Sequence, residues 1–169
     1  MMHPRRIRRT RDNASASQEV LKSLTAIPRD IAGLAKGCSD QQLHRQPRPD
    51  AWSARDVLAH LRACADVWGS SIGRMLAENH PTIKYTSPRS WIKKTDYFNQ
   101  TFGASLNAFT RDRSQLLKSL KKLDASGWSR GATFTGTTLG RNATVLDYAK
   151  RIADHEVHHM DQIRRTLDL

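Results

Sequence analysis

Apolar residues recur at spacings of three and four along most of this chain, which is the period of one face of an α-helix. The first series predicts a helix from about residue 15 to residue 36 that stops at Gly37. Pro28 lies inside this segment and lacks a backbone N–H, so we expect it to kink or split the helix. The apolar positions of the series are Val20, Leu24, Ile27, Ile31 and Leu34.

The second predicted helix has the clearest start in the sequence. Ser53 is a favourable N-cap, and Asp56 three residues later completes a capping box. Trp52 and Val57 stand at the two positions of a hydrophobic staple. His60 lies on the flank of the apolar stripe, where its side chain leans inward. The stripe continues to about residue 79 through Leu61, Cys64, Trp68, Ile72 and Met75.

Two further helices are predicted, at about residues 95–124 and 144–167. The last one starts at a second capping box, Thr144 with Asp147, and carries two histidines in its apolar stripe. Residues 80–94 form a polar connection, and the segment Ala132-Thr133-Phe134-Thr135 is too short for a sheet of its own. Four amphipathic helices without a series of strands predict an all-α fold, a four-helix bundle.

The composition indicates one domain preceded by a basic arm. A length of 169 residues suits a single domain, which we place at residues 15–169. Residues 1–14 contain almost no apolar side chains and are expected to be disordered. The net charge is +12, and 23 basic and 15 acidic residues remain after the arm is removed. The arm carries Arg5, Arg6, Arg8, Arg9 and Arg11.

The basic charge favours nucleic acid, anionic membranes or small acidic substrates as partners. Arginine-rich arms bind phosphates without sequence preference, so a nucleic-acid contact of the arm is one interpretation and a solvated tail is the other. No segment has the roughly 18 apolar residues of a membrane span, and no apolar segment follows the N-terminal arginines as in a secretory signal. We therefore expect a cytoplasmic protein without a membrane partner, whose two cysteines stay reduced.

The most informative stretch is the last helix, where His155 and His159 are four residues apart. This spacing places both imidazoles on one face of the helix, within reach of one metal ion. A tightly held metal needs a third ligand, for which His60 is the best candidate. Three imidazoles with one open position form the pattern of catalytic zinc, and nitrogen ligands also suit nickel or iron. For any single histidine, a hydrogen-bonded core or surface position is the alternative.

Three neighbouring residues could belong to the same site. His158 follows His155 by three residues, but it points about 100° away from His159 around the helix, so we expect it at the site edge or exposed. Cys64 stands one turn after His60 and could approach the metal, or it could be a small buried residue. Glu156 is the candidate for a catalytic acid or base, and a solvated position is its alternative.

The letters His155-Glu156-Val157-His158-His159 also match H-E-x-x-H, a metallopeptidase pattern in which the glutamate is the general base. The extended form of that pattern requires glycine and histidine where this chain has Gln162 and Arg165. The sequence also lacks the strand that would hold an extended peptide. These differences argue against a peptidase.

Two short motifs resemble the DinB/YfiT-like family. They are Trp52-Ser53 opening a helix with His60-Leu61, and His155, His159 and Gln162-Ile163 on the last helix. The similarity spans roughly Leu24 to Leu167. It implies a four-helix bundle, often a homodimer, with one divalent metal on His60, His155 and His159 and an open position for water.

Family activities include thiol transfer with low-molecular-weight thiols and mycothiol-dependent isomerisation. The resemblance therefore implies a metal-dependent enzyme, thiol transferase-like or hydrolase-like, that acts on a small molecule. The basic surface favours an anionic one. Two alternatives of other classes are a basic nucleic-acid-binding protein and a metal-free interaction module.

Overall fold

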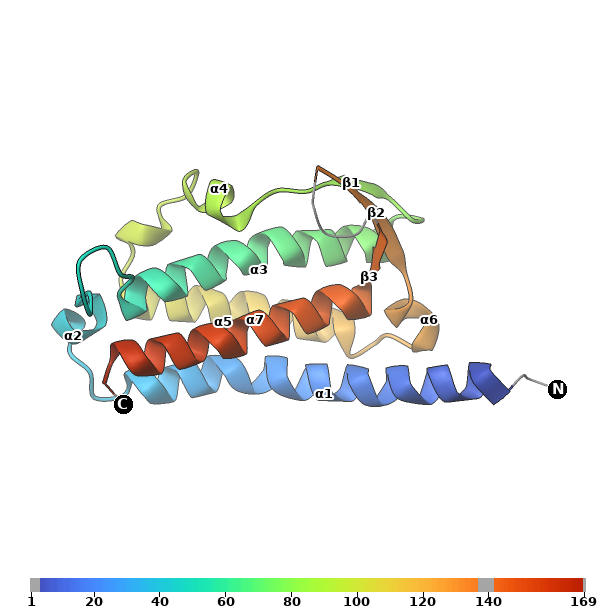
Figure 1. Cartoon of the computed structure of the whole chain (residues 1–169), viewed down its shortest axis with the longest axis horizontal. Helices are drawn as coiled ribbons and strands as arrows, with labels where there is room; N and C mark the ends of the chain where they lie inside the picture. The colour runs from blue at the N-terminus through green and yellow to red at the C-terminus, as the bar shows by residue number, and fades with distance from the viewer. Residues whose placement is uncertain (1–3, 137–141, 169) are drawn as a thin grey trace.

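Four long helices form the body of the molecule, seen in a computed structural model that describes residues 4–136 and 142–168. Each of the four packs against two neighbours around a shared core, so the predicted four-helix bundle is confirmed (Figure 1). The helices are α1 (Pro4–Ala35), α3 (Ala54–Ala77), α5 (Phe102–Leu120) and α7 (Val145–Thr166).

The direction of the helices separates this bundle from a simple up-and-down arrangement. Helices α3 and α5 run the same way along the bundle, and α1 and α7 run the opposite way (Figure 1). The connection from α3 to α5 therefore returns along the bundle and lies over α3. It contains strand β1 (Thr82–Lys84), the short helix α4 (Pro88–Ile92) and the 3-10 helix η1 (Tyr97–Asn99).

Local sequence signals set the starts of the helices that carry the histidines. Both predicted capping boxes are present: Ser53 with Asp56 at α3, and Thr144 with Asp147 at α7. In each, the hydroxyl accepts from the N3 backbone N–H, while the carboxylate accepts from the N-cap backbone N–H. A third capping box, at Ser39, begins the short helix α2 (Asp40–His44). The sequence thus determined where α3 and α7 begin.

The first helix ends at Ala35, just before Gly37 as predicted, but it starts earlier than predicted and is not split at Pro28. It begins at Pro4, so the backbone of residues 4–14 is helical where a disordered arm was expected. Proline is favourable in the first turn, and the residues after it include no glycine, so the helix extends without a local break. Pro28 lies within α1 without ending it, because the buried side chains of Leu24, Ile27 and Ile31 hold both halves on the bundle core.

A small sheet covers one end of the bundle, which corrects the expectation that no strands form. Strand β2 (Gly131–Thr135) pairs parallel with β1 and antiparallel with β3 (Asn142–Thr144). The four-residue helix α6 (Ala125–Trp128) precedes it. Strand β1, far earlier in the sequence, and the nearby strand β3 supply the hydrogen bonds that the short segment could not make alone. At Gly131, a Cβ atom would lie 2.9 Å from the carbonyl oxygen of Ala143, so the pairing requires glycine there.

The apolar stripes predicted for the helices form the core. Leu24, Ile72, Leu120 and Ile152 come from the four different long helices and are all at most 1% exposed. In the described part of the chain, no helix has the length and apolar character needed to span a bilayer.

Candidate metal centre

Helices α3 and α7 bring three histidines together inside the bundle. Nε2 of His155 lies 3.3 Å from Nε2 of His60 and 3.1 Å from Nε2 of His159. His60 is 7% exposed, and the other two are partly buried. The ring of Trp52, just before α3, lies 5.0 Å from the His60 ring, and the ring of Trp68 lies 4.8 Å from the His155 ring. Residues 95 positions apart in sequence thus share one site.

The spacing of the three nitrogens fits a metal ion. Zinc–nitrogen bonds of about 2.0–2.1 Å at tetrahedral angles place neighbouring ligand nitrogens roughly 3.3–3.4 Å apart, close to the two observed separations. Hydrogen bonding alone explains the cluster less well. One Nε2 atom of a neutral imidazole either donates or accepts, so the Nε2 atom of His155 cannot serve both neighbours equally. A cation shared by three lone pairs satisfies all of them.

The other ring nitrogen of His159 supports the same interpretation. Its Nδ1 atom lies 2.7 Å from Oε1 of Gln162, one turn further along α7. A carbonyl oxygen accepts only, so Nδ1 carries the proton and Nε2 presents its lone pair to the centre. Gln162 therefore orients the ligand and sets its tautomer. His155 has no such partner among the described residues, since its buried Nδ1 atom is without a hydrogen bond.

Burial keeps the three imidazoles neutral, the form that binds metal. It lowers the pKa of His60 to about 4 and that of His155 to about 3, and neighbouring positive charges contribute further. The pKa of His159 is also lowered, chiefly by burial, although the Gln162 hydrogen bond opposes the shift. A cation at the centre would not have to displace protons near neutral pH.

The family model of the DinB superfamily matches residues 23–163. This chain belongs to the DinB superfamily. The structure is similar to that of YfiT from Bacillus subtilis, described as a probable metal-dependent hydrolase with an unusual four-helix bundle topology. That similarity has a TM-score of 0.72 and 19% sequence identity, and covers 88% of this chain and 86% of YfiT. No curated protein matches the sequence.

The two residues expected near the edge of the site, His158 and Cys64, each contact one of the three histidines. His158 is exposed, and its ring packs edge-on against that of His159. Cys64 is buried, with Sγ 3.4 Å from Nε2 of His60. Burial, followed by the charge of Glu156, raises the pKa of the Cys64 thiol far above its usual range. The thiol is therefore protonated and is not a nucleophile in this state.

Glu156, the glutamate of the H-E-x-x-H letters, does not belong to the solvated surface. Its side chain is 0% exposed and pairs with Arg113 of α5, whose side chain is 2% exposed. Burial raises the pKa of Glu156 more than the arginine lowers it. The solvated alternative was wrong because the Glu156 side chain points into the bundle core, where the Arg113 side chain reaches it from the diagonally placed α5. In this DinB protein Glu156 links α7 to α5, and its carboxylate lies in the bundle core, paired with Arg113.

The charges of two arginines act on the three histidines. The charge of Arg89, on α4, lowers the pKa of both His60 and His159, and the charge of Arg151 on α7 does the same to His155. The Arg151 guanidinium also lies 4.8 Å from the centre of the Trp68 ring. No carboxylate contributes to these shifts among the described residues. Sequence reasoning missed both arginines. Only the fold brings Arg89 near the histidines, whereas Arg151 lies four residues before His155 on α7, a spacing that could have revealed it.

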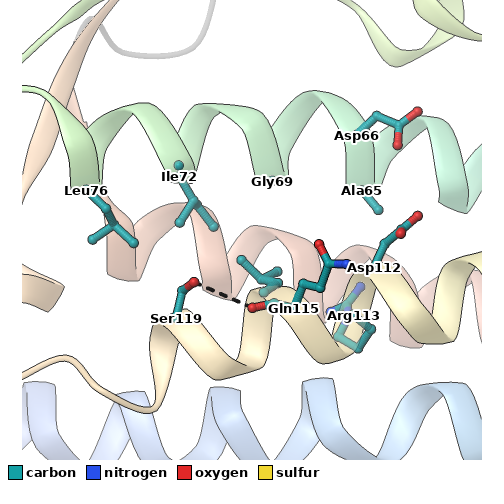
Figure 2. A pocket seen from close by; sticks show the side chains of 11 residues that line it. Ala65, Asp66, Gly69, Ile72, Leu76, Asp112, Arg113, Gln115 and Ser119 are labelled. Atoms are coloured by element: carbon teal, nitrogen blue, oxygen red, sulfur yellow. Dashed lines mark hydrogen bonds between the residues drawn. The ribbon is translucent and has the colours of Figure 1, made fainter.

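A separate cavity of about 250 Å³ lies between α3 and α5 (Figure 2). Figure 2 shows Ile72 and Leu76 pointing from α3 toward α5, and Asp112 and Arg113 on the opposite wall. None of the three histidines lines this cavity. It is therefore not the pocket of the metal centre.

Proposed function

We propose that this protein is a metal-dependent hydrolase that binds one divalent ion through His60, His155 and His159 and acts on a small anionic molecule. The convergence of three Nε2 atoms at metal-ligand spacing carries the proposal. YfiT, of similar fold, is described as a probable metal-dependent hydrolase, and this supports hydrolysis over thiol transfer. A bound divalent ion with three protein ligands supplies a Lewis acid that activates water.

The side chains around the centre have separate roles in this proposal. His60, His155 and His159 hold the ion, and Gln162 orients His159. Arg89 and Arg151 supply positive charge that attracts an anionic substrate and stabilises negative charge as it develops. Trp52 and Trp68 pack against two of the ligand rings and restrict water around them. Elemental analysis will show whether the ion is zinc, nickel or iron.

Elemental analysis of the purified protein tests the site. We expect about one divalent ion per chain. His155→Ala should abolish binding, and His60→Ala and His159→Ala should strongly reduce it. His158→Ala is the matched control, since this exposed histidine is next to a ligand and should retain the metal. Metal retained in all three ligand variants would refute the assignment.

The reaction class needs a second measurement. The metal-loaded protein should hydrolyse anionic aryl esters or phosphates faster than their neutral analogues, and chelation should remove that activity. If the protein transfers a low-molecular-weight thiol and does not hydrolyse these compounds, a thiol transferase replaces the hydrolase as the proposed function.

Two expectations about partners stay predictions: that the protein forms a homodimer, and that the N-terminal arginines contact nucleic acid. These arginines are Arg5, Arg6, Arg8, Arg9 and Arg11. The side chains of these arginines lie outside the described residues.

A further inference from the structure

A groove of about 260 Å³ lies between α3 and residues 83–91 of the connection that covers it. Val67, Ser71 and Arg74 line it from α3, and Ile83, Lys84 and Trp91 line it from the connection. The groove combines an apolar floor, one aromatic ring and two basic side chains. None of the three histidines lines it, so it is a feature additional to the metal centre.

The groove lies along the same face of α3 as the histidine ligand. His60, Val67, Ser71 and Arg74 follow one another at spacings of seven, four and three, which keeps them on one side of the helix. A rise of 1.5 Å per residue places Val67 about 10 Å along the axis from His60. Helix α4 lies near both His60 and the groove, because the charge of its Arg89 acts on His60 and its Trp91 lines the groove.

Trp91 is exposed and yet held in place. It is 36% exposed, which is unusual for a large apolar side chain of this protein. Its indole N–H donates to Oδ2 of Asp66 over 2.9 Å, and the Tyr97 hydroxyl donates to the same atom over 2.7 Å. The ring is therefore oriented before any ligand arrives, so stacking on it orders few additional groups.

The two cations of the groove differ in their availability. Arg74 donates to both carboxylate oxygens of Glu78, at 2.6 and 2.7 Å. Lys84 forms no ion pair within the described part of the chain. The Asp66 carboxylate, the acid on the wall, accepts from Trp91 and Tyr97. The charge left for a ligand is positive and belongs to Lys84.

We propose that this groove is a substrate subsite that takes the aromatic, negatively charged end of an extended substrate whose reacting group lies at the three histidines. The aromatic ring stacks on Trp91 and packs against Val67 and Ile83, and the anionic group pairs with Lys84. This subsite rests on the proposed metal-dependent function. It specifies the substrate class as an aromatic organic anion long enough to span about 10 Å along α3.

The probe 1-anilinonaphthalene-8-sulfonate tests the recognition in the metal-loaded full chain. Trp91→Ala should weaken its binding about fivefold, whereas Trp91→Phe, which keeps a ring, should weaken it less. Lys84→Gln should weaken it about threefold. The same variant should not affect N-phenyl-1-naphthylamine, which has the same rings without the sulfonate. The indole N–H signal of Trp91 should shift in the NMR spectrum, and that of Trp128, on α6, should not.

Unchanged binding in Trp91→Ala and Lys84→Gln, or an unchanged Trp91 signal, would overturn the subsite. Its relation to the metal centre is tested by loading cobalt(II), a paramagnetic ion that should accelerate the relaxation of the probe's protons. With cobalt bound, the absence of this effect overturns the connection between groove and centre. Failure of the proposed function shows separately, as a wild-type chain that binds no divalent metal in elemental analysis of the same samples.

Discussion

Replacing Arg113 by methionine should destabilise the bundle far more than the loss of an ordinary ion pair. The side chains of Arg113 and Glu156 are 2% and 0% exposed, so water does not screen either charge. Breaking a buried pair leaves one uncompensated charge in the core and costs about 3–5 kcal/mol. Domains of this size have about 5–15 kcal/mol of total stability, so the change is a large fraction of it.

The structure also predicts how this loss depends on pH. Without the arginine, the pKa of Glu156 should rise further above its ordinary value, because burial already raises it and the opposing charge is gone. A glutamate has a pKa of about 4.3 in the unfolded chain. When its pKa is higher in the folded state, the free energy of unfolding is greatest below about pH 4.3 and decreases as pH rises above that value. The stability of Arg113→Met should therefore fall as pH rises from about 4 toward 7. The wild type should lose stability in parallel over this range, because burial raises the pKa of its Glu156 to about 7, and the gap between the two proteins should widen only above that pH.

Urea unfolding at pH 4.5, pH 7 and pH 8.5 measures both effects, and a double variant keeps the test informative if the single one does not fold. Arg113→Met with Glu156→Leu removes both charges and should be close to wild type in stability. Arg113 Nε, Arg113 Nη1 and Glu156 Oε2 have no hydrogen-bond partner among the described residues, which limits what the pair contributes. Glu78→Gln is the matched control, because it breaks the exposed Arg74–Glu78 pair and should change stability little.

Two results would refute this reasoning. A single variant as stable as wild type at pH 7 would mean that the pair is not buried in solution. Loss of metal from the folded double variant would mean that Glu156 acts at the metal centre rather than in the core.

Three further predictions concern the metal ligands, a helix cap and the sheet. Since the pKa values of His60 and His155 are lowered by burial, the metal-free protein should lose stability as pH falls from about 6.5 toward 4 in thermal melts. Replacing His155 by phenylalanine should reduce that dependence, and an unchanged profile would contradict it. Ser53→Ala removes the cap of α3 and should cost about 1 kcal/mol in urea unfolding, with no change in metal content. Gly131→Val should lower the melting temperature, because its Cβ would meet the Ala143 carbonyl oxygen; a neutral result would mean that β2 and β3 separate.

The sequence by itself determined the features that depend on residues three or four positions apart. The capping boxes at Ser53 and Thr144 are local hydrogen bonds, so both helix starts were predicted correctly. The i, i+4 spacing of His155 and His159 placed two ligand candidates on one face for the same reason. His60 was selected by its inward-leaning position and by a family resemblance. Within a helix, these relationships follow from its period, whatever the rest of the fold does.

Tertiary structure alone decided the features that depend on partners distant in the sequence. The sequence around Glu156 is the same whether the side chain faces solvent, a metal or the core. Packing of the four-helix bundle brings Arg113 of α5 to it from 43 positions away. Strand β2 exists because β1 and β3 complete its hydrogen bonds, and Arg89 approaches the histidines because the α3–α5 connection returns over α3. Hydrogen bonds and charge–charge interactions between such segments form only after the bundle has packed, so no local sequence pattern encodes them.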